Sequence, residues 1–180
     1  MKEFDNTLKT PARETLQPLV GARLLLWGQP FPQDERASRH RAFEHVRLET
    51  SRGTFMMSLT ETGEFPDTCS MVILGEPAWL KMIEANDSVV HPDEWHDVRI
   101  DRTIQSVRVF SDSGTDVRGA DPDVTVVRDT CGIAFILDDG TALLFEKTYS
   151  GSEIWDVSIS DKGAVLLSGR NPDYIVSKTL

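Results

Sequence analysis

The sequence contains little cysteine, fewer basic than acidic residues and no long hydrophobic run. Its two cysteines, Cys69 and Cys131, are too far apart for a metal-binding or redox motif, so we expect two reduced, buried thiols. Lys and Arg together number 19 against 29 Asp and Glu, which gives a formal net charge of −10. Because nucleic acids and anionic membranes are bound through clustered Lys and Arg, this composition argues against both kinds of partner.

No run approaches the roughly 20 apolar residues of a transmembrane helix. The first residues, MKEFDNTLKTPARETLQ, lack the apolar region of a signal peptide, so we expect a cytoplasmic protein. The hydrophobic share of 39% and the charged share of 27% are typical of soluble globular proteins. Residues 1–180 are long enough to bury one hydrophobic core, so we expect a single domain, with disorder over about residues 1–10.

Sequence motifs of catalysis and nucleotide binding are also missing, because the chain has no GxSxG, SxxK, GxGxxG or GxxxxGK[ST]. All four histidines fall in two pairs with a spacing of five, which places the two members of a pair on opposite faces of a strand. A metal site built from His91, Asp93, Glu94 and His96 would have to lie in a loop. We therefore expect solvated side chains there, with no bound metal and no cofactor.

Short apolar runs bounded by turn residues predict about ten strands. The clearest is the hairpin over 45–59, in which apolar residues alternate on both sides of a Ser51-Arg52-Gly53 turn. The strands are expected at 19–27, 45–49, 55–59, 70–74, 98–100, 106–110, 124–127, 131–137, 141–147, 153–160 and 163–168.

Helices are few. The pattern predicts one that begins at Glu76-Pro77, carries an apolar stripe from Trp79 to Ile83 and ends near Asn86. A short helix is expected over Pro11–Gln17, because Thr10-Pro11 suits a helix start. Together these elements predict a β-rich α+β fold: one or more antiparallel sheets, arranged as a sandwich or a partly open barrel, with one or two packed helices.

The stretch GIAFILDDGTALLFE, residues 132–146, is apolar on both faces of a predicted hairpin. A two-residue type I′ turn at Asp139-Gly140 would place Phe135 opposite Leu144 on one face and Ala134 opposite Phe145 on the other. One face belongs to the main core. The other needs a cover from the helix stripe, from a second sheet or from another chain, and we expect the helix to supply it because internal burial keeps the protein soluble.

The charges are unevenly distributed along the chain. Residues 20–60 carry six Arg and four acidic residues, whereas residues 61–97 carry nine acidic residues against Lys81 alone. Such a run often forms an ordinary solvated surface. It also suits a face that steers a basic partner, with an aromatic side chain as its anchor. The candidate partner-binding residues are Glu61, Glu64, Asp67, Asp87, Asp93, Glu94, Trp95 and Asp97.

The C-terminal pattern FILDDGTALLFEK followed by SEIWDVSIS, in a small acidic β-rich chain, resembles the immunity proteins of bacterial polymorphic toxin systems. The resemblance implies a non-enzymatic inhibitor, monomeric or homodimeric, that occludes the site of a basic cognate toxin. It assigns no individual residue. Two alternatives stay open: a small-molecule-binding β-barrel or sandwich, and an enzyme with a dispersed His and acid site, which would leave no local trace in the sequence.

Overall fold

The structure is a computed structural model that describes residues 2–6, 8, 14–30, 40–62, 65–85, 94–113, 124–147, 154–160 and 174–177. The elements are β1 (Lys2–Asn6), the 3-10 helix η1 (Gln17–Leu19), β2 (Arg23–Gln29), β3 (His40–Phe43), β4 (His45–Thr50), β5 (Gly53–Thr62), β6 (Phe65–Gly75), the helix α2 (Glu76–Glu84), β7 (His96–Ser113), β8 (Val124–Leu137), β9 (Ala142–Lys147), β10 (Ile154–Ser160) and β11 (Tyr174–Ser177).

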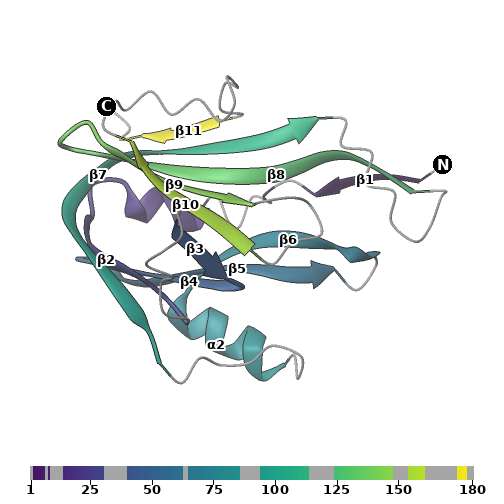
Figure 1. The fold of residues 1–180 in the computed structure, drawn as a ribbon, viewed down its shortest axis with the longest axis horizontal. Coiled ribbons are helices and arrows are strands. Elements are labelled where there is room, and N and C mark those ends of the chain that lie inside the picture. Colours follow the sequence, from purple (N-terminus) through teal and green to yellow (C-terminus); the bar gives the residue numbers. More distant parts are fainter. Residues whose placement is uncertain are drawn as a thin grey trace.

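The described strands form one hydrogen-bonded sheet that is folded into two layers. Its order is β3-β10-β9-β8-β7-β2-β4-β5-β6, with β1 beside β8 and β11 beside β7. All pairings are antiparallel except the parallel pair of β1 and β8. Figure 1 shows β8 and β9 in one layer, β4 to β6 in the other, and β7 curving between them. This arrangement confirms the predicted β-rich α+β fold.

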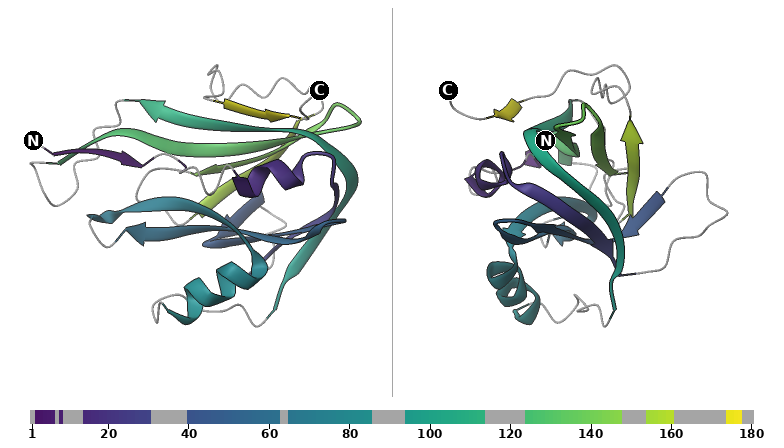
Figure 2. Two further views of the ribbon diagram at one scale, coloured as in Figure 1. Left: turned by 180° about the vertical axis from the view of Figure 1, so that it is seen from behind. Right: turned by 90° about the vertical axis from the view of Figure 1, so that its left-hand side faces the viewer.

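The long strand β7 belongs to both layers. Its first part pairs with β2 and its second part with β8. Between these parts Asp101 has a φ of 58°, and the β7–β8 ladder shifts register between Ile104 and Ser106. Register shifts of this kind bend a strand and increase its twist, and Asp tolerates positive φ better than most residues. The bend turns the end of β7 out of the β2 layer and into the β8 layer (Figure 2).

A second corner joins β3 to β4. Only Glu44, with a φ of 53°, separates them, yet β3 pairs with β10 in one layer and β4 pairs with β2 and β5 in the other. The ladder path from β3 through β10, β9, β8, β7 and β2 therefore returns to β4, next to its starting point. The result is a partly open barrel from which β5 and β6 extend.

Most expected elements are present, with differences in extent. The 45–59 hairpin and the helix from Glu76 are confirmed. The separate strands expected at 98–100 and 106–110 are one strand, β7, and those at 124–127 and 131–137 are also one, β8. The backbone is helical at 14–16, just before η1. Disorder is expected over about residues 1–10, but β1 in this stretch pairs with β8. The strand expected at 163–168 lies outside the described residues.

The register of the 132–146 hairpin differs from the predicted one. Its loop has three residues, Asp138, Asp139 and Gly140, because Leu137 N–H donates to Thr141 O at 2.8 Å and Gly140 N–H donates to Leu137 O at 3.0 Å. Gly140 has a φ of 83°, as in a type I turn followed by a left-handed residue. One extra loop residue shifts the pairing by one position, so every β9 side chain faces the side opposite to that predicted.

The main core lies between the two layers and includes the inner-face residues Ile133, Phe135, Leu137, Leu143 and Phe145 of this hairpin. The other face, with Ala134, Ile136, Ala142 and Leu144, is buried together with Phe110. Cys131 is half-buried beside this second cluster, where its Sγ–H donates to Phe110 O at 3.5 Å. The side chain of Cys69 lies outside the described part.

The expectation that α2 covers the second face of the hairpin is wrong. Trp79 and Ile83 of α2 pack instead on Met56 of β5, with Leu74 of β6 beside them. The physical reason is the chain connection, because α2 begins at Glu76 directly after β6 ends at Gly75. A helix with no linker packs back on the strand it follows, which here is on the outer side of the β5–β6 layer (Figure 1).

Candidate functional site

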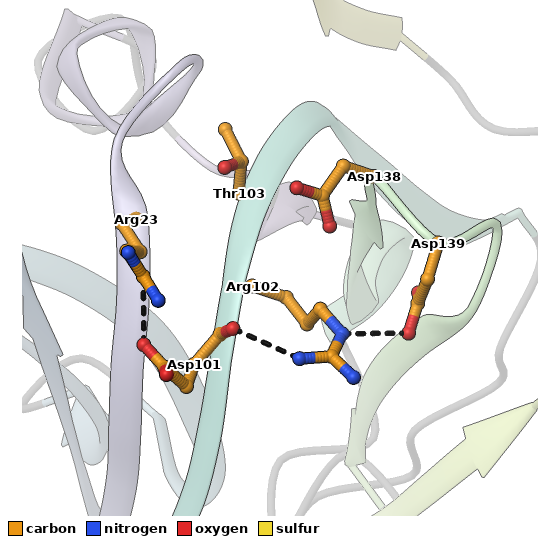
Figure 3. A pocket seen from close by; sticks show the side chains of 6 residues that line it. All are labelled: Arg23, Asp101, Arg102, Thr103, Asp138 and Asp139. Carbon is orange, nitrogen blue, oxygen red and sulfur yellow. Dashed lines mark hydrogen bonds and ion pairs between the residues drawn. The ribbon is translucent and has the colours of Figure 1, made fainter.

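A charged surface pocket lies at the corner where β7 bends. It has a volume of about 500 Å³ and is lined by residues from three separate segments: Arg23 at the start of β2; Asp101, Arg102 and Thr103 at the bend of β7; and Asp138 and Asp139 in the β8–β9 turn. Figure 3 shows these side chains around the pocket. Asp138 N–H donates to Thr103 O at 2.9 Å, which ties the turn to the bend.

Two ion pairs occupy the pocket walls. Arg23 Nε lies 2.7 Å from Asp101 Oδ1, and Arg102 Nε lies 3.0 Å from Asp139 Oδ2. The hydrogen bond from Arg23 lowers the pKa of Asp101 and raises that of the Arg23 guanidinium. Hydrogen bonds from the hydroxyl and the backbone N–H of Thr141, with a smaller contribution from Arg102, lower the pKa of Asp139 to about 2. Both carboxylates therefore stay ionised at neutral pH.

Asp138 is the third carboxylate of the pocket. It is exposed, and among the described residues its carboxylate has no hydrogen bond or ion pair. Figure 3 shows it directed into the pocket, between Thr103 and Arg102. The six lining residues together carry one excess negative charge, and Arg99 beside the pocket, whose Nη2 lies 3.9 Å from Asp101 Oδ2, partly compensates it.

The lining residues do not pair a nucleophile with a general base. Thr103 supplies a hydroxyl, but the groups around it are arginines and ionised carboxylates. Such a lining can bind a charged group by complementarity, and its ion pairs also have a structural role, because they hold β2, β7 and the β8–β9 turn together at the corner.

The sequence-predicted residues lie in two places. Glu94 is exposed, Trp95 is half-buried and Asp97 is exposed at the start of β7. Glu61 on β5 and Asp67 on β6 belong to another pair of strands, β5 and β6. The side chains of Glu61 and Asp67, and the residues Glu64, Asp87 and Asp93, lie outside what the structure describes.

Asp97, at the end of the acidic segment, is compensated by a basic side chain. Arg47 Nη2 donates to both carboxylate oxygens of Asp97, at 2.8 and 2.9 Å. The Arg47 guanidinium carbon also lies 5.0 Å from the ring centre of Trp95, a cation–π distance. Arg47 therefore orients Trp95 and neutralises Asp97, and Glu94 remains as an exposed carboxylate.

A buried polar cluster lies beneath α2. His45 Nδ1 is 2.9 Å from Ser58 Oγ, and Trp79 Nε1 donates to the same oxygen at 2.8 Å. His45 Nε2 is 3.6 Å from a carboxylate oxygen of Glu44. The residue types and contacts are those of a serine–histidine–acid relay, but Ser58 is fully buried and His45 is 1% exposed. In this conformation the cluster fixes α2 on the sheet and offers no access to a substrate.

The corner pocket has only a partial signal in the sequence. The acidic pair Asp138-Asp139 is visible in the sequence. The structure confirms that Asp139 stabilises the turn, because its carboxylate accepts a hydrogen bond from Thr141 N–H at 3.0 Å. The alternation Asp97-Val98-Arg99-Ile100-Asp101 is a signal that the sequence-based prediction did not use, since charges at every second position of a strand mark a solvent-facing face.

Neither a metal centre nor a membrane helix is found in the described part of the chain. None of its His, Cys, Asp and Glu side chains form a group of three or more that could hold a metal ion, and His91 and Asp93 lie outside it. None of its helices is long and apolar enough to cross a membrane. No protein-family model, curated protein or solved structure matches the chain.

Proposed function

We propose that this protein is a non-enzymatic binding protein that recognises a basic protein partner and acts as an immunity protein against a toxin. The observation that carries the proposal is the corner pocket, in which Asp138 is exposed and makes no hydrogen bond or close ion pair with a described residue, while Arg23, paired with Asp101, attracts it only electrostatically. A lysine or arginine side chain of a partner is the group that such a pocket fits best.

The charge of the whole chain supports the same class of partner. A formal net charge of −10 attracts basic proteins from a distance and speeds their association, whereas it repels phosphate-rich surfaces. The pocket is also preorganised, because its two ion pairs and the Thr141 hydrogen bonds fix the neighbouring side chains before a partner arrives. A fixed site loses less conformational entropy on binding than a mobile one.

A second recognition element is part of the proposal. Trp95 offers a partly exposed ring beside the exposed Glu94, and Arg47 holds that ring in place. Aromatic side chains held in this way are common anchors of protein interfaces. The acidic segment would then contribute through Glu94 and Trp95 more than through Asp97, whose charge Arg47 already compensates.

The test uses the product of the gene next to the one that encodes this protein. Co-expression should protect cells from growth arrest by that product, and the purified pair should form a stoichiometric complex. Association should slow as salt rises, because screening removes the electrostatic steering. Lack of both protection and complex would contradict the proposal.

A matched set of charge reversals tests the pocket itself. Asp138→Lys should reduce the association rate several-fold at low salt, with a smaller effect at high salt. Glu84→Lys changes the net charge by the same amount at an exposed position of α2 and serves as the control. Glu94→Lys tests the contribution of the β7 start. Equal effects of Asp138→Lys and Glu84→Lys would show that only net charge matters, and would remove the pocket from the interface.

A further inference from the structure

Two side chains of β2 carry polar atoms into the core between the layers without a hydrogen-bond partner there. Trp27 is 1% exposed and Gln29 is fully buried. Neither the indole Nε1 of Trp27 nor the amide Nε2 and Oε1 of Gln29 makes a hydrogen bond to any described residue. The two residues are two positions apart in a regular stretch, where Trp27 pairs with Val98 and Gln29 with His96, so their side chains project from the same face of the strand.

The surroundings of these atoms are apolar and aromatic. The Trp27 ring packs edge-on against Phe145, with centroids 5.6 Å apart, and Phe145 packs in the same way against Phe135 and Trp155 at 6.0 and 6.4 Å. Val46 and Leu48 of the neighbouring strand β4 are fully buried in the same core. The rings pack closely against one another, so any molecule bound beside Trp27 must be small.

Three buried hydrogen-bonding atoms on one face of one strand that have no partner among the described residues are unusual. In native proteins the great majority of buried polar atoms are hydrogen-bonded to protein or to a bound molecule, because an unmade bond in an apolar medium is costly. The backbone of Gln29 is paired with His96 in the β2–β7 ladder. The end of the strand is therefore fixed and cannot turn to bring the Gln29 side-chain amide to solvent. A bound molecule would satisfy all three atoms at once.

We propose that Trp27 and Gln29 form an interior binding site for one small neutral molecule that both donates and accepts hydrogen bonds. The molecule accepts hydrogen bonds from Trp27 Nε1 and Gln29 Nε2 and donates one to Gln29 Oε1. Each of the three buried polar atoms then has a partner. It is neutral because the neighbouring core residues are apolar and a buried charge there would lack a counter-charge. Lys147, the buried cation of β9, already has an interaction of its own.

Two sources have this chemistry: a permanently bound water molecule and a small organic molecule with an amide, urea or alcohol group. The site lies in the core between the layers, whereas the corner pocket is on the surface, so the interior site does not depend on the proposed function. Failure of either would leave the other standing.

The deciding measurement is the sign of a stability change. Gln29→Met keeps the length of the side chain and removes the amide. If a molecule is bound, the variant removes the amide that forms hydrogen bonds with it, and the Tm falls by roughly 2–4 °C for each bond lost. If the amide is merely unsatisfied, the same variant relieves it and the Tm rises, which would overturn the proposal. Gln105→Met, at an exposed position of β7, is the matched control and should leave the Tm unchanged.

Two further measurements identify the bound molecule and test whether both residues hold it. In NMR spectra of the full chain, the Trp27 indole N–H should show cross-peaks either to water or to the C–H groups of an organic molecule. Native mass spectrometry should show a mass increment only in the organic case, and Gln29→Met should abolish it. In a Trp27→Phe background the Tm effect of Gln29→Met should shrink, because one shared molecule makes the two changes non-additive. Full additivity, or no cross-peak of either kind, would overturn the shared site.

Discussion

Arg47 on β4 and Asp97 on β7 meet above Gly28, which lies on the strand between them. The register places Gly28 opposite both residues, and Arg47 Nη2 donates to the two carboxylate oxygens at 2.8 and 2.9 Å. A Cβ atom at Gly28 would clash with Oδ1 of Asp97. The ion pair that orients Trp95 therefore depends on a residue without a side chain beneath it.

Gly28→Ala should lower the free energy of unfolding by about 1 kcal/mol or less, because the added methyl group displaces the exposed Asp97 carboxylate from Arg47. Urea denaturation monitored by tryptophan fluorescence measures the change. The control repeats the substitution in an Asp97→Ala background, where the oxygen that clashes is gone. We expect a clearly smaller loss there. The same loss in both backgrounds would show that the carboxylate is not the cause.

Gly140 is the left-handed residue of the three-residue loop in the 132–146 hairpin. Its φ of 83° is accessible to Gly and Asn at little cost, whereas other residues are strained by roughly 1–2 kcal/mol. Gly140→Ala should therefore reduce the free energy of unfolding by about that amount, and Gly140→Asn by distinctly less. An added methyl group would clash with nothing, since no atom of another residue lies within 4 Å of the place it would take. Equal losses for Ala and Asn would mean that backbone strain is not the source.

This hairpin shows how far the sequence could be used to predict the fold. The Asp-Gly pair and the flanking apolar runs identify a turn, and the turn is present. They do not distinguish a two-residue from a three-residue loop, because both types place Gly at a left-handed position. The choice depends on Asp139, whose carboxylate accepts from both the N–H and the hydroxyl of Thr141. A side-chain contact that decides a register is not visible as a hydrophobic pattern.

The corner pocket was less accessible to sequence-based prediction. Arg23 and Asp101 are 78 residues apart, and Arg102 and Asp139 are 37 apart. Their meeting depends on the bend of β7, which in turn depends on a positive φ at Asp101 and on shifts in two ladders. The sequence pattern instead predicts two separate strands with a break between them. Local composition indicates an acidic protein, but it does not show which carboxylates are left without a basic partner.

The low pKa of Asp139 predicts a pH dependence of the hairpin. An unfolded aspartate has a pKa of about 3.9, whereas the folded value is about 2, lowered first by the Thr141 hydroxyl. Because the folded value is the lower one, Asp139 stabilises the fold above about pH 4, and this contribution is lost as pH falls toward 2. An NMR titration of the Asp139 carboxyl carbon measures the pKa directly.

Thr141→Val removes the hydroxyl that makes the largest contribution to this shift and keeps the backbone N–H and the shape of the side chain. The pKa of Asp139 should rise toward the ordinary aspartate range, while the Arg102 ion pair remains. Arg102→Gln removes both the hydrogen bond and the charge of Arg102 and should also raise the pKa of Asp139. An unchanged pKa of Asp139 in Thr141→Val would show that the hydroxyl is not the largest cause.

Ser58 on β5 links α2 to the sheet by accepting a hydrogen bond from Trp79 Nε1 at 2.8 Å, and its hydroxyl also lies 2.9 Å from Nδ1 of His45 on the neighbouring strand β4. Ser58→Ala deprives both rings of this partner in a fully buried place, so the free energy of unfolding should fall by about 1–3 kcal/mol. Hydrogen exchange should show the loss mainly in α2, because the strands keep their ladder bonds. In a Trp79→Phe background the indole donor is already gone, and Ser58→Ala should cost less there. If instead the two substitutions add fully, Ser58 does not act through Trp79, and the hydrogen bond between them does not hold α2 in place.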